Sequence, residues 1–163
     1  INFNRVITTS RVFQSPSEIE NRMDNMDLQI QNNRLQIQTK CIEVKQNLLH
    51  VVEPPVAPEN RKFVARRWWR AKRGRRSEII NTLRDHRATQ DNKSMILLPV
   101  GANADIVRVS HYFDNFTDAI DAFGSMSGPD SAPETIANRS KLAELSEESF
   151  TSIHRIVATN YTG

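Results

Sequence analysis

The amino-acid sequence predicts a mainly α-helical chain with a small β component, in the α+β class. A strong helix start, Ser15-Pro16-Ser17-Glu18, is followed by no Gly or Pro until Pro54. Strand signals come later, where residues 94–100 and 104–113 are rich in β-branched and other apolar side chains on either side of a short turn containing Gly101. These features predict a long N-terminal helix, several shorter helices and one β-hairpin.

The first 52 residues are expected to form an arm and one long helix. Residues 3–14 favour a short strand or an extended arm, because β-branched and aromatic residues are frequent in them. The next residues form a capping box, in which Ser15 and Glu18 satisfy the first backbone N–H groups, with Pro16 at the first helical position. Helix-favouring residues follow, so we expect one helix over about residues 16–52.

A seven-residue repeat runs through residues 28–52, and each unit is apolar–polar–apolar. On a helix these positions form two stripes on opposite sides, since residues two apart are separated by about 200°. One side is expected to pack on this chain and the other on a second subunit, although a central helix of an ordinary bundle shows the same pattern. The expected self-association residues are Met23, Leu28, Ile30, Leu35, Ile37, Ile42, Val44, Leu49 and Val51.

The same repeat also fits a β-hairpin. A turn at Asn32-Asn33 would place Leu28, Ile30, Leu35 and Ile37 on one face of two short strands. The capping box upstream favours the helix, and the hairpin stays open as the alternative.

The rest of the chain is expected to alternate helices with the hairpin. The Pro-rich residues 54–60 form a linker. Pro58 then begins a second, basic helix with Gly74 just past its end, and Ser77 caps a third. A short helix ends near Gly124, and a final helix spans about 133–158. The expected organisation is arm and packing helix (1–53), linker (54–60), basic segment (61–76) and a small α+β region that becomes acidic toward its end (77–163).

Charge is concentrated in the basic segment. The net charge is +3, yet residues 61–76 contain nine basic side chains and no acidic one. Guanidinium groups bind phosphates bidentately, and tryptophans stack on unpaired bases. This composition predicts a nucleic-acid contact, with RNA or single strands favoured, made by Arg61, Lys62, Arg66, Arg67, Trp68, Trp69, Arg70, Lys72, Arg73, Arg75 and Arg76.

The basic segment also fits two different roles. Its arginines could pair with the acidic C-terminal half or with another subunit. Alternatively, Arg70-Ala71-Lys72-Arg73 resembles the cleavage site of furin-type proprotein convertases. In that case the chain would be a secretory or envelope ectodomain fragment cleaved after Arg73, with glycosylation sequons at Asn92, Asn115, Asn138 and Asn160.

The sequence shows no catalytic, metal-binding or cofactor-binding motif. The four histidines have no metal-ligand spacing, and no glycine-rich phosphate loop is present. Cys41 is the single cysteine, which excludes an intrachain disulfide. No apolar run reaches the roughly 18 residues of a membrane span. The chain begins with Ile1 and shows no signal-peptide core, so we expect a processed chain located inside a cell or a virion.

Together these patterns predict a non-enzymatic structural protein. It would be a self-associating subunit of a nucleoprotein assembly, such as a viral capsid or core component, that contacts nucleic acid through the basic segment. The processed ectodomain is the first alternative, and an enzyme without a recognisable motif is the second.

Overall fold

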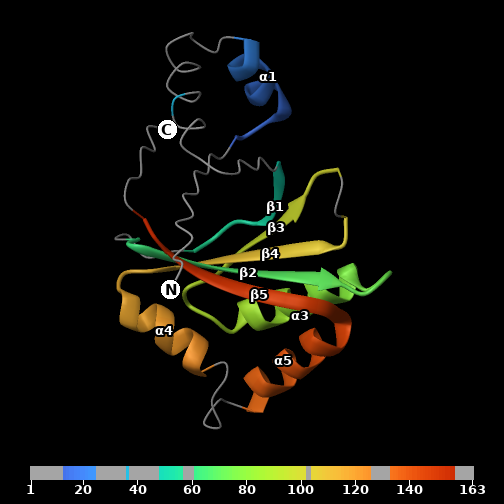
Figure 1. Ribbon diagram of the computed structural model, residues 1–163, viewed down its shortest axis with the longest axis vertical. Helices are drawn as coiled ribbons and strands as arrows, with labels where there is room; N and C mark the ends of the chain where they lie inside the picture. The colour runs from blue at the N-terminus through green and yellow to red at the C-terminus, as the bar shows by residue number, and fades with distance from the viewer. Residues whose placement is uncertain are drawn as a thin grey trace. The chain divides into compact units, whose positions relative to one another are not determined.

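The computed structural model describes residues 13–24, 36, 48–56, 61–101, 104–125 and 133–156. By its internal contacts the chain divides into two units, residues 1–46 and residues 47–163. The first unit contains helix α1 (Pro16–Asp24), and the second contains the other elements labelled in Figure 1.

Helix α1 begins where the sequence predicts. The Ser15 hydroxyl accepts a hydrogen bond from the backbone N–H of Glu18 (3.2 Å). The Glu18 carboxylate in turn accepts one from the backbone N–H of Gln14 (2.8 Å), one residue before the N-cap, so the two side chains form a variant of the capping box. One helix over residues 16–52 is nevertheless wrong, because Leu49–Glu53 form strand β1. The alternative turn at Asn32-Asn33 lies outside the described residues.

The second unit is built on a five-stranded sheet whose pairs are all antiparallel. Its strands lie side by side in the order β1-β3-β4-β2-β5. The basic segment therefore supplies the strand between β4 and β5. In chain order the strands are β1 (Leu49–Glu53), β2 (Phe63–Ala71), β3 (Met95–Pro99), β4 (Ile106–Phe113) and β5 (Ser146–Arg155).

Helices α3 (Arg76–Ala88), α4 (Phe116–Ser125) and α5 (Pro133–Leu145) pack against one face of this sheet, here named the helix face (Figure 1). Helix α3 connects β2 to β3, and α4 and α5 connect β4 to β5. The core lies between the two layers. Its larger cluster contains Trp69, Ala71, Ile79, Leu83, Ile96, Val107, Leu142 and Leu145, and its smaller cluster contains Ala65, Phe113 and Ala119.

The mainly helical class is wrong, and the basic segment is the clearest correction. It forms strand β2 instead of a helix, with Ala65 and Trp69 in the core on the helix face. Val64, on the opposite side of the strand, is also buried. A strand that is buried on both sides shows no clean apolar–polar alternation, so periodicity alone could not separate it from a helix.

Two further elements differ from the sequence prediction. The final helix ends at Leu145, because Ser146–Arg155 form β5 along β2. Helix α3 starts at Arg76, and its N-cap is Arg75 instead of Ser77. The predicted hairpin is confirmed, since Met95 pairs with Ser110 and Leu97 with Arg108. The short helix near Gly124 is also confirmed as α4.

Candidate functional site

Strand β2 presents its side chains to two different environments, because successive residues of a strand point to opposite faces. Arg67 and Trp69 point to the helix face. Arg66, Trp68 and Arg70 point to the other side of the sheet, here named the second face. The two tryptophans of the basic segment therefore lie on opposite faces of the sheet.

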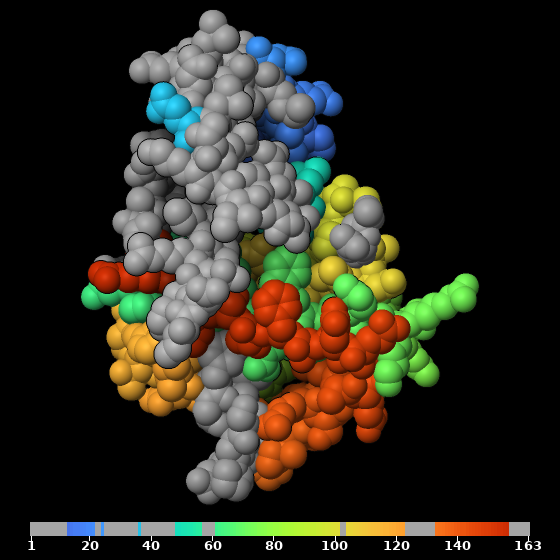
Figure 2. Space-filling view, viewed as in Figure 1, coloured from blue at the N-terminus to red at the C-terminus, as the bar shows by residue number. Residues whose placement is uncertain are grey.

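A cleft of about 260 Å³ lies on the helix face between β2, β5, α3 and α5, and we name it the Arg67 cleft. Figure 2 shows the red-orange atoms of β5 beside the orange atoms of α5, the two elements that border it. Its polar and aromatic lining comes from all four elements and includes Arg67, Trp69, His86, Asn138, Arg139 and Thr151.

The Arg67 guanidinium is held in place by its neighbours. Its Nε donates a hydrogen bond to the Thr151 hydroxyl on the adjacent strand (2.8 Å). Its Cζ lies 5.7 Å from the centre of the Trp69 ring, at cation–π distance. Burial, and then the positive charge of Arg139, lower the pKa of Arg67 from its ordinary value. Two neighbouring cations in a partly desolvated cleft favour an anionic ligand.

His86 places a neutral imidazole in the same cleft. Burial lowers the pKa of His86, and the opposing effect of Glu134 is smaller. The imidazole is therefore mainly uncharged near neutral pH. Its Nε2 lies 2.9 Å from Nε2 of Gln90, just past the end of α3. An uncharged imidazole can accept a proton from an acidic ligand, so the cleft combines two cations with one base.

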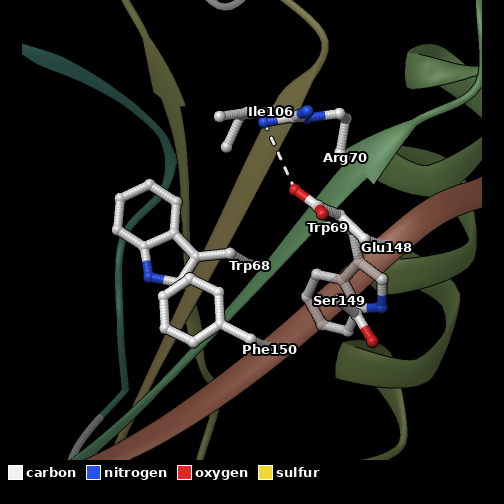
Figure 3. A pocket seen from close by; sticks show the side chains of 7 residues that line it. All are labelled: Trp68, Trp69, Arg70, Ile106, Glu148, Ser149 and Phe150. Carbon is white, nitrogen blue, oxygen red and sulfur yellow. Dashed lines mark ion pairs between the residues drawn. The ribbon is translucent and has the colours of Figure 1, made fainter.

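A second hollow, of about 220 Å³, lies at the end of β2 beside β5. Trp68 and Phe150 stack there with ring centres 6.3 Å apart and planes 5° from parallel. Arg70 forms an ion pair with Glu148 (3.2 Å), and Figure 3 shows this pair next to the stacked rings. The arginine here is already paired with a carboxylate, which makes this hollow a weaker anion site than the Arg67 cleft.

The predicted nucleic-acid residues do not form one surface. Arg67 and Trp69 lie on the helix face, and Arg66, Trp68 and Arg70 lie on the second face. The others precede or follow the strand, or begin α3: Arg61, Lys62, Lys72, Arg73, Arg75 and Arg76. Arg75 is paired with Glu78 (2.6 Å). A strand in the middle of a sheet divides the segment, so it cannot act as one continuous basic patch.

Most of the predicted self-association residues lie outside the part of the chain that the structure describes. Leu49 and Val51 lie in strand β1, so their place on a helical stripe is wrong. Met23 is within α1, but its side chain is not among the described ones. Self-association itself stays a prediction. The other members of the set lie outside the described residues: Leu28, Ile30, Leu35, Ile37, Ile42 and Val44.

The sequence prediction did not include most residues of the Arg67 cleft, among them His86, Asn138, Arg139 and Thr151. They come from three separate elements, and no spacing in the sequence joins them. In the sequence, Asn138 is recognisable only as part of a sequon. No alternation marked residues 146–155 as a strand, since their two large apolar residues, Phe150 and Ile153, are three positions apart.

The described residues hold no group of three or more His, Cys, Asp or Glu side chains arranged to bind a metal. Among the helices of the described part, none has both the length and the hydropathy to cross a membrane.

The connectivity of the second unit defines its class. Strand β2, helix α3, strands β3 and β4, helix α5 and strand β5 follow the βαββαβ order of ferredoxin-like folds, and β1 is added beside β3. Solved structures share this fold. An anthrone oxidase-like protein matches with a TM-score of 0.64 and 11% identity, over 90% of this chain and 69% of its own.

Two bacterial proteins provisionally assigned as monooxygenases have the same fold. The protein from Lactobacillus acidophilus NCFM matches with a TM-score of 0.60 and 9% identity, over 88% of this chain and 66% of its own. The protein from Fusobacterium nucleatum subsp. nucleatum matches with a TM-score of 0.58 and 8% identity, over 86% and 64%. At these identities the similarity establishes the fold alone. No protein-family model and no curated protein matches the sequence.

These findings overturn the function that the sequence predicted. The structures that share the fold are monooxygenase-like proteins of the ferredoxin-like class, not capsid or nucleoprotein subunits. The coiled-coil-like packing helix on which the structural assignment depended is interrupted by strand β1. The middle of the basic segment, Phe63–Ala71, is an interior strand of the sheet, and nucleic-acid binding itself stays a prediction.

Proposed function

We propose that this chain is a ferredoxin-like domain that binds a planar, acidic aromatic molecule in the Arg67 cleft. The observation that carries the proposal is the Arg67 guanidinium, fixed between the Thr151 hydroxyl and the Trp69 ring at the cleft wall. A phenolate or carboxylate pairs well with a guanidinium, and a flat ring system gains from contact with an aromatic wall.

The cleft supports this ligand class in two further ways. Arg139 adds a second positive charge close enough to affect the pKa of Arg67. Asn138 adds a neutral amide that can donate and accept hydrogen bonds. A cleft of about 260 Å³ suits a small molecule of two or three fused rings better than a polymer.

A second candidate function is oxidation of the bound molecule by molecular oxygen. It is favoured by the neutral His86, which can take the proton of an acidic C–H or O–H group. The fold of the anthrone oxidase-like protein makes anthrone the natural probe. Its ring CH₂ would become C=O with one oxygen atom of O₂, and the two hydrogens would leave with the other oxygen atom as water.

The proposal is tested with anthrone and 2-naphthoate as ligands. Trp68→Phe leaves Trp69 as the tryptophan reporter, so binding is followed by quenching of its fluorescence and confirmed by calorimetry. Arg67→Met should weaken binding at least about tenfold, because it removes a charged hydrogen-bond donor. Arg70→Met is the matched control, since Arg70 lies on the same strand but on the second face, and it should bind as the parent does.

Oxygen consumption with anthrone, measured on the same samples, tests the second candidate. His86→Gln should slow it while leaving the dissociation constant nearly unchanged. Equal binding by the Arg67 and Arg70 variants would contradict the proposed cleft. Binding without oxygen consumption would retain the binding function and reject the oxidation.

A further inference from the structure

The second face of the sheet gathers positive charge around one buried arginine. Arg108, in the middle of β4, is 8% exposed. Its Cζ lies 5.0 Å from the centre of the Trp68 ring on β2, at cation–π distance. Its Nε has no hydrogen-bond partner, and within the described part of the chain no carboxylate forms an ion pair with it. Burying a cation without a counter-charge is unfavourable, so this position is incomplete as it stands.

Arg108 pairs directly with Trp68 and Leu97 on the adjacent strands, and polar or positive side chains lie around it at the diagonal positions. Ser110 is two residues further along β4, is fully buried, and its hydroxyl has no hydrogen-bond partner. Arg66 pairs directly with Ser110 across the strands, which brings its side chain diagonally opposite Arg108. On β5, His154 lies diagonally opposite Arg66, and its Nε2 is 2.8 Å from the Ser152 hydroxyl.

The pKa values of these groups reflect their proximity. Burial first, and then the charge of Arg66, lower the pKa of Arg108 to about 10, while Tyr112 acts in the opposite direction. The pKa of His154 is also lowered, by burial and then by the charges of Arg66 and Arg108. Arg108 still carries its proton at neutral pH, and His154 is kept mainly neutral. The three side chains thus share one electrostatic environment.

We propose that the second face carries an oxyanion-binding site centred on Arg108, with the Ser110 hydroxyl, Arg66 and His154 around it. Its ligand is a phosphate or carboxylate group, because a guanidinium with an adjacent hydroxyl donor matches the oxygen geometry of both. The site lies on the opposite side of the sheet from the Arg67 cleft and does not depend on the function proposed for that cleft.

Thermal unfolding and phosphorus NMR with inorganic phosphate test this site on the full chain. Sodium chloride at matched ionic strength is the control for general charge screening, and sodium acetate separates a carboxylate source from a phosphate source. A ligand that binds only the folded state raises the melting temperature, and the stabilisation grows with the logarithm of 1 + [L]/Kd. We expect phosphate or acetate to do so beyond the effect of chloride. Arg108→Gln should weaken binding at least about tenfold, the loss of one charged donor.

Three further variants test whether the anion binds at the site around Arg108. Arg70→Gln, on the same face but paired with Glu148, should keep the parent's dissociation constant. Arg67→Met removes the main anion-binding group of the Arg67 cleft, so the phosphate or acetate binding that remains in this variant is assigned to the second face. Ser110→Ala is small enough to preserve the fold and should weaken binding several-fold, which tests the site even if Arg108→Gln does not fold. The proposal is overturned if neither anion exceeds chloride in the parent, or if Arg108→Gln and Ser110→Ala both bind as the parent does.

Discussion

At the scale of single residues, the position of each arginine along β2 decides its role. Arg67 lies in a cleft with Trp69 and Thr151, Arg70 pairs with Glu148, and Arg66 lies beside Arg108 on the opposite face. All three are chemically identical and within five positions of one another. The alternation of the strand is what separates them into different environments.

The histidines allow a prediction about pH at this scale. Burial is the largest cause of the lowered pKa of His111, with a smaller contribution from His86, while its interaction with Asn92 acts the other way. The unfolded chain therefore takes up a proton near pH 6.5, before the folded protein does. Stability contributed by the neutral imidazole is present above that pH and is lost as the pH falls through 6.5 toward the folded value.

The free energy of unfolding, measured by urea titration, should thus decrease between about pH 7.5 and about pH 5.5, a range above most carboxylate titrations. His111→Gln removes one of the groups responsible, so its decrease over the same range should be smaller than that of the parent. The pKa values of His86 and His154 are lowered too. These two histidines should therefore still cause part of the decrease in the free energy of unfolding of the His111→Gln variant. An identical pH slope in both proteins would show that His111 is not kept neutral by the fold.

At the scale of elements, the connection between β2 and α3 depends on one glycine. Gly74 has a φ of +77°, in the left-handed region that side-chain-bearing residues rarely adopt. The turn is closed by the backbone N–H of Arg75, which donates to the carbonyl of Lys72 (2.9 Å). A Cβ atom at Gly74 would meet no other atom within 4 Å, so the cost of a substitution there comes from the backbone alone.

Gly74→Ala should therefore lower the free energy of unfolding by about 1–2 kcal/mol, the cost of the left-handed conformation for an ordinary residue. Gly74→Asn should cost less, because asparagine adopts this conformation more readily. Chemical denaturation of the three proteins measures both effects. If alanine and glycine proved equally stable, the turn would have to adopt another conformation.

At the scale of the whole molecule, residues 47–163 form a compact unit with their own core. The sheet, its three covering helices and both core clusters are all drawn from this range. A fragment of residues 47–163 is expected to fold alone and to unfold cooperatively, as single domains of this size usually do.

Circular dichroism of this fragment should show a mixed α/β spectrum and one sigmoidal thermal transition. Amide exchange should protect β3, β4 and β2 most strongly, since each of them lies between two neighbouring strands. A fragment that unfolds gradually would indicate that residues 1–46 contribute to the stability of the sheet.

The sequence by itself determined those elements whose signals are local. The capping box of Ser15 and Glu18 begins α1, because its hydrogen bonds join residues within one turn. The hairpin of β3 and β4 was visible for a similar reason, since its strands are neighbours in the chain and are joined by a short turn. The charge of the basic segment was also evident from composition, which needs no knowledge of the fold.

Tertiary structure alone decided that the basic segment is a strand and that residues 146–155 continue as β5. Both depend on pairing between residues about 80 positions apart, such as Arg67 with Thr151, whose Nε–Oγ1 bond spans 84 positions. Local propensity carries no information about such a distant partner. The candidate site required the same long-range pairing, because Arg67, His86, Asn138 and Thr151 meet only when the strands and helices pack together. The function predicted from the sequence was wrong for the same reason. The sequence shows how many basic residues the segment contains, but it does not show that the fold divides them between two faces of a sheet.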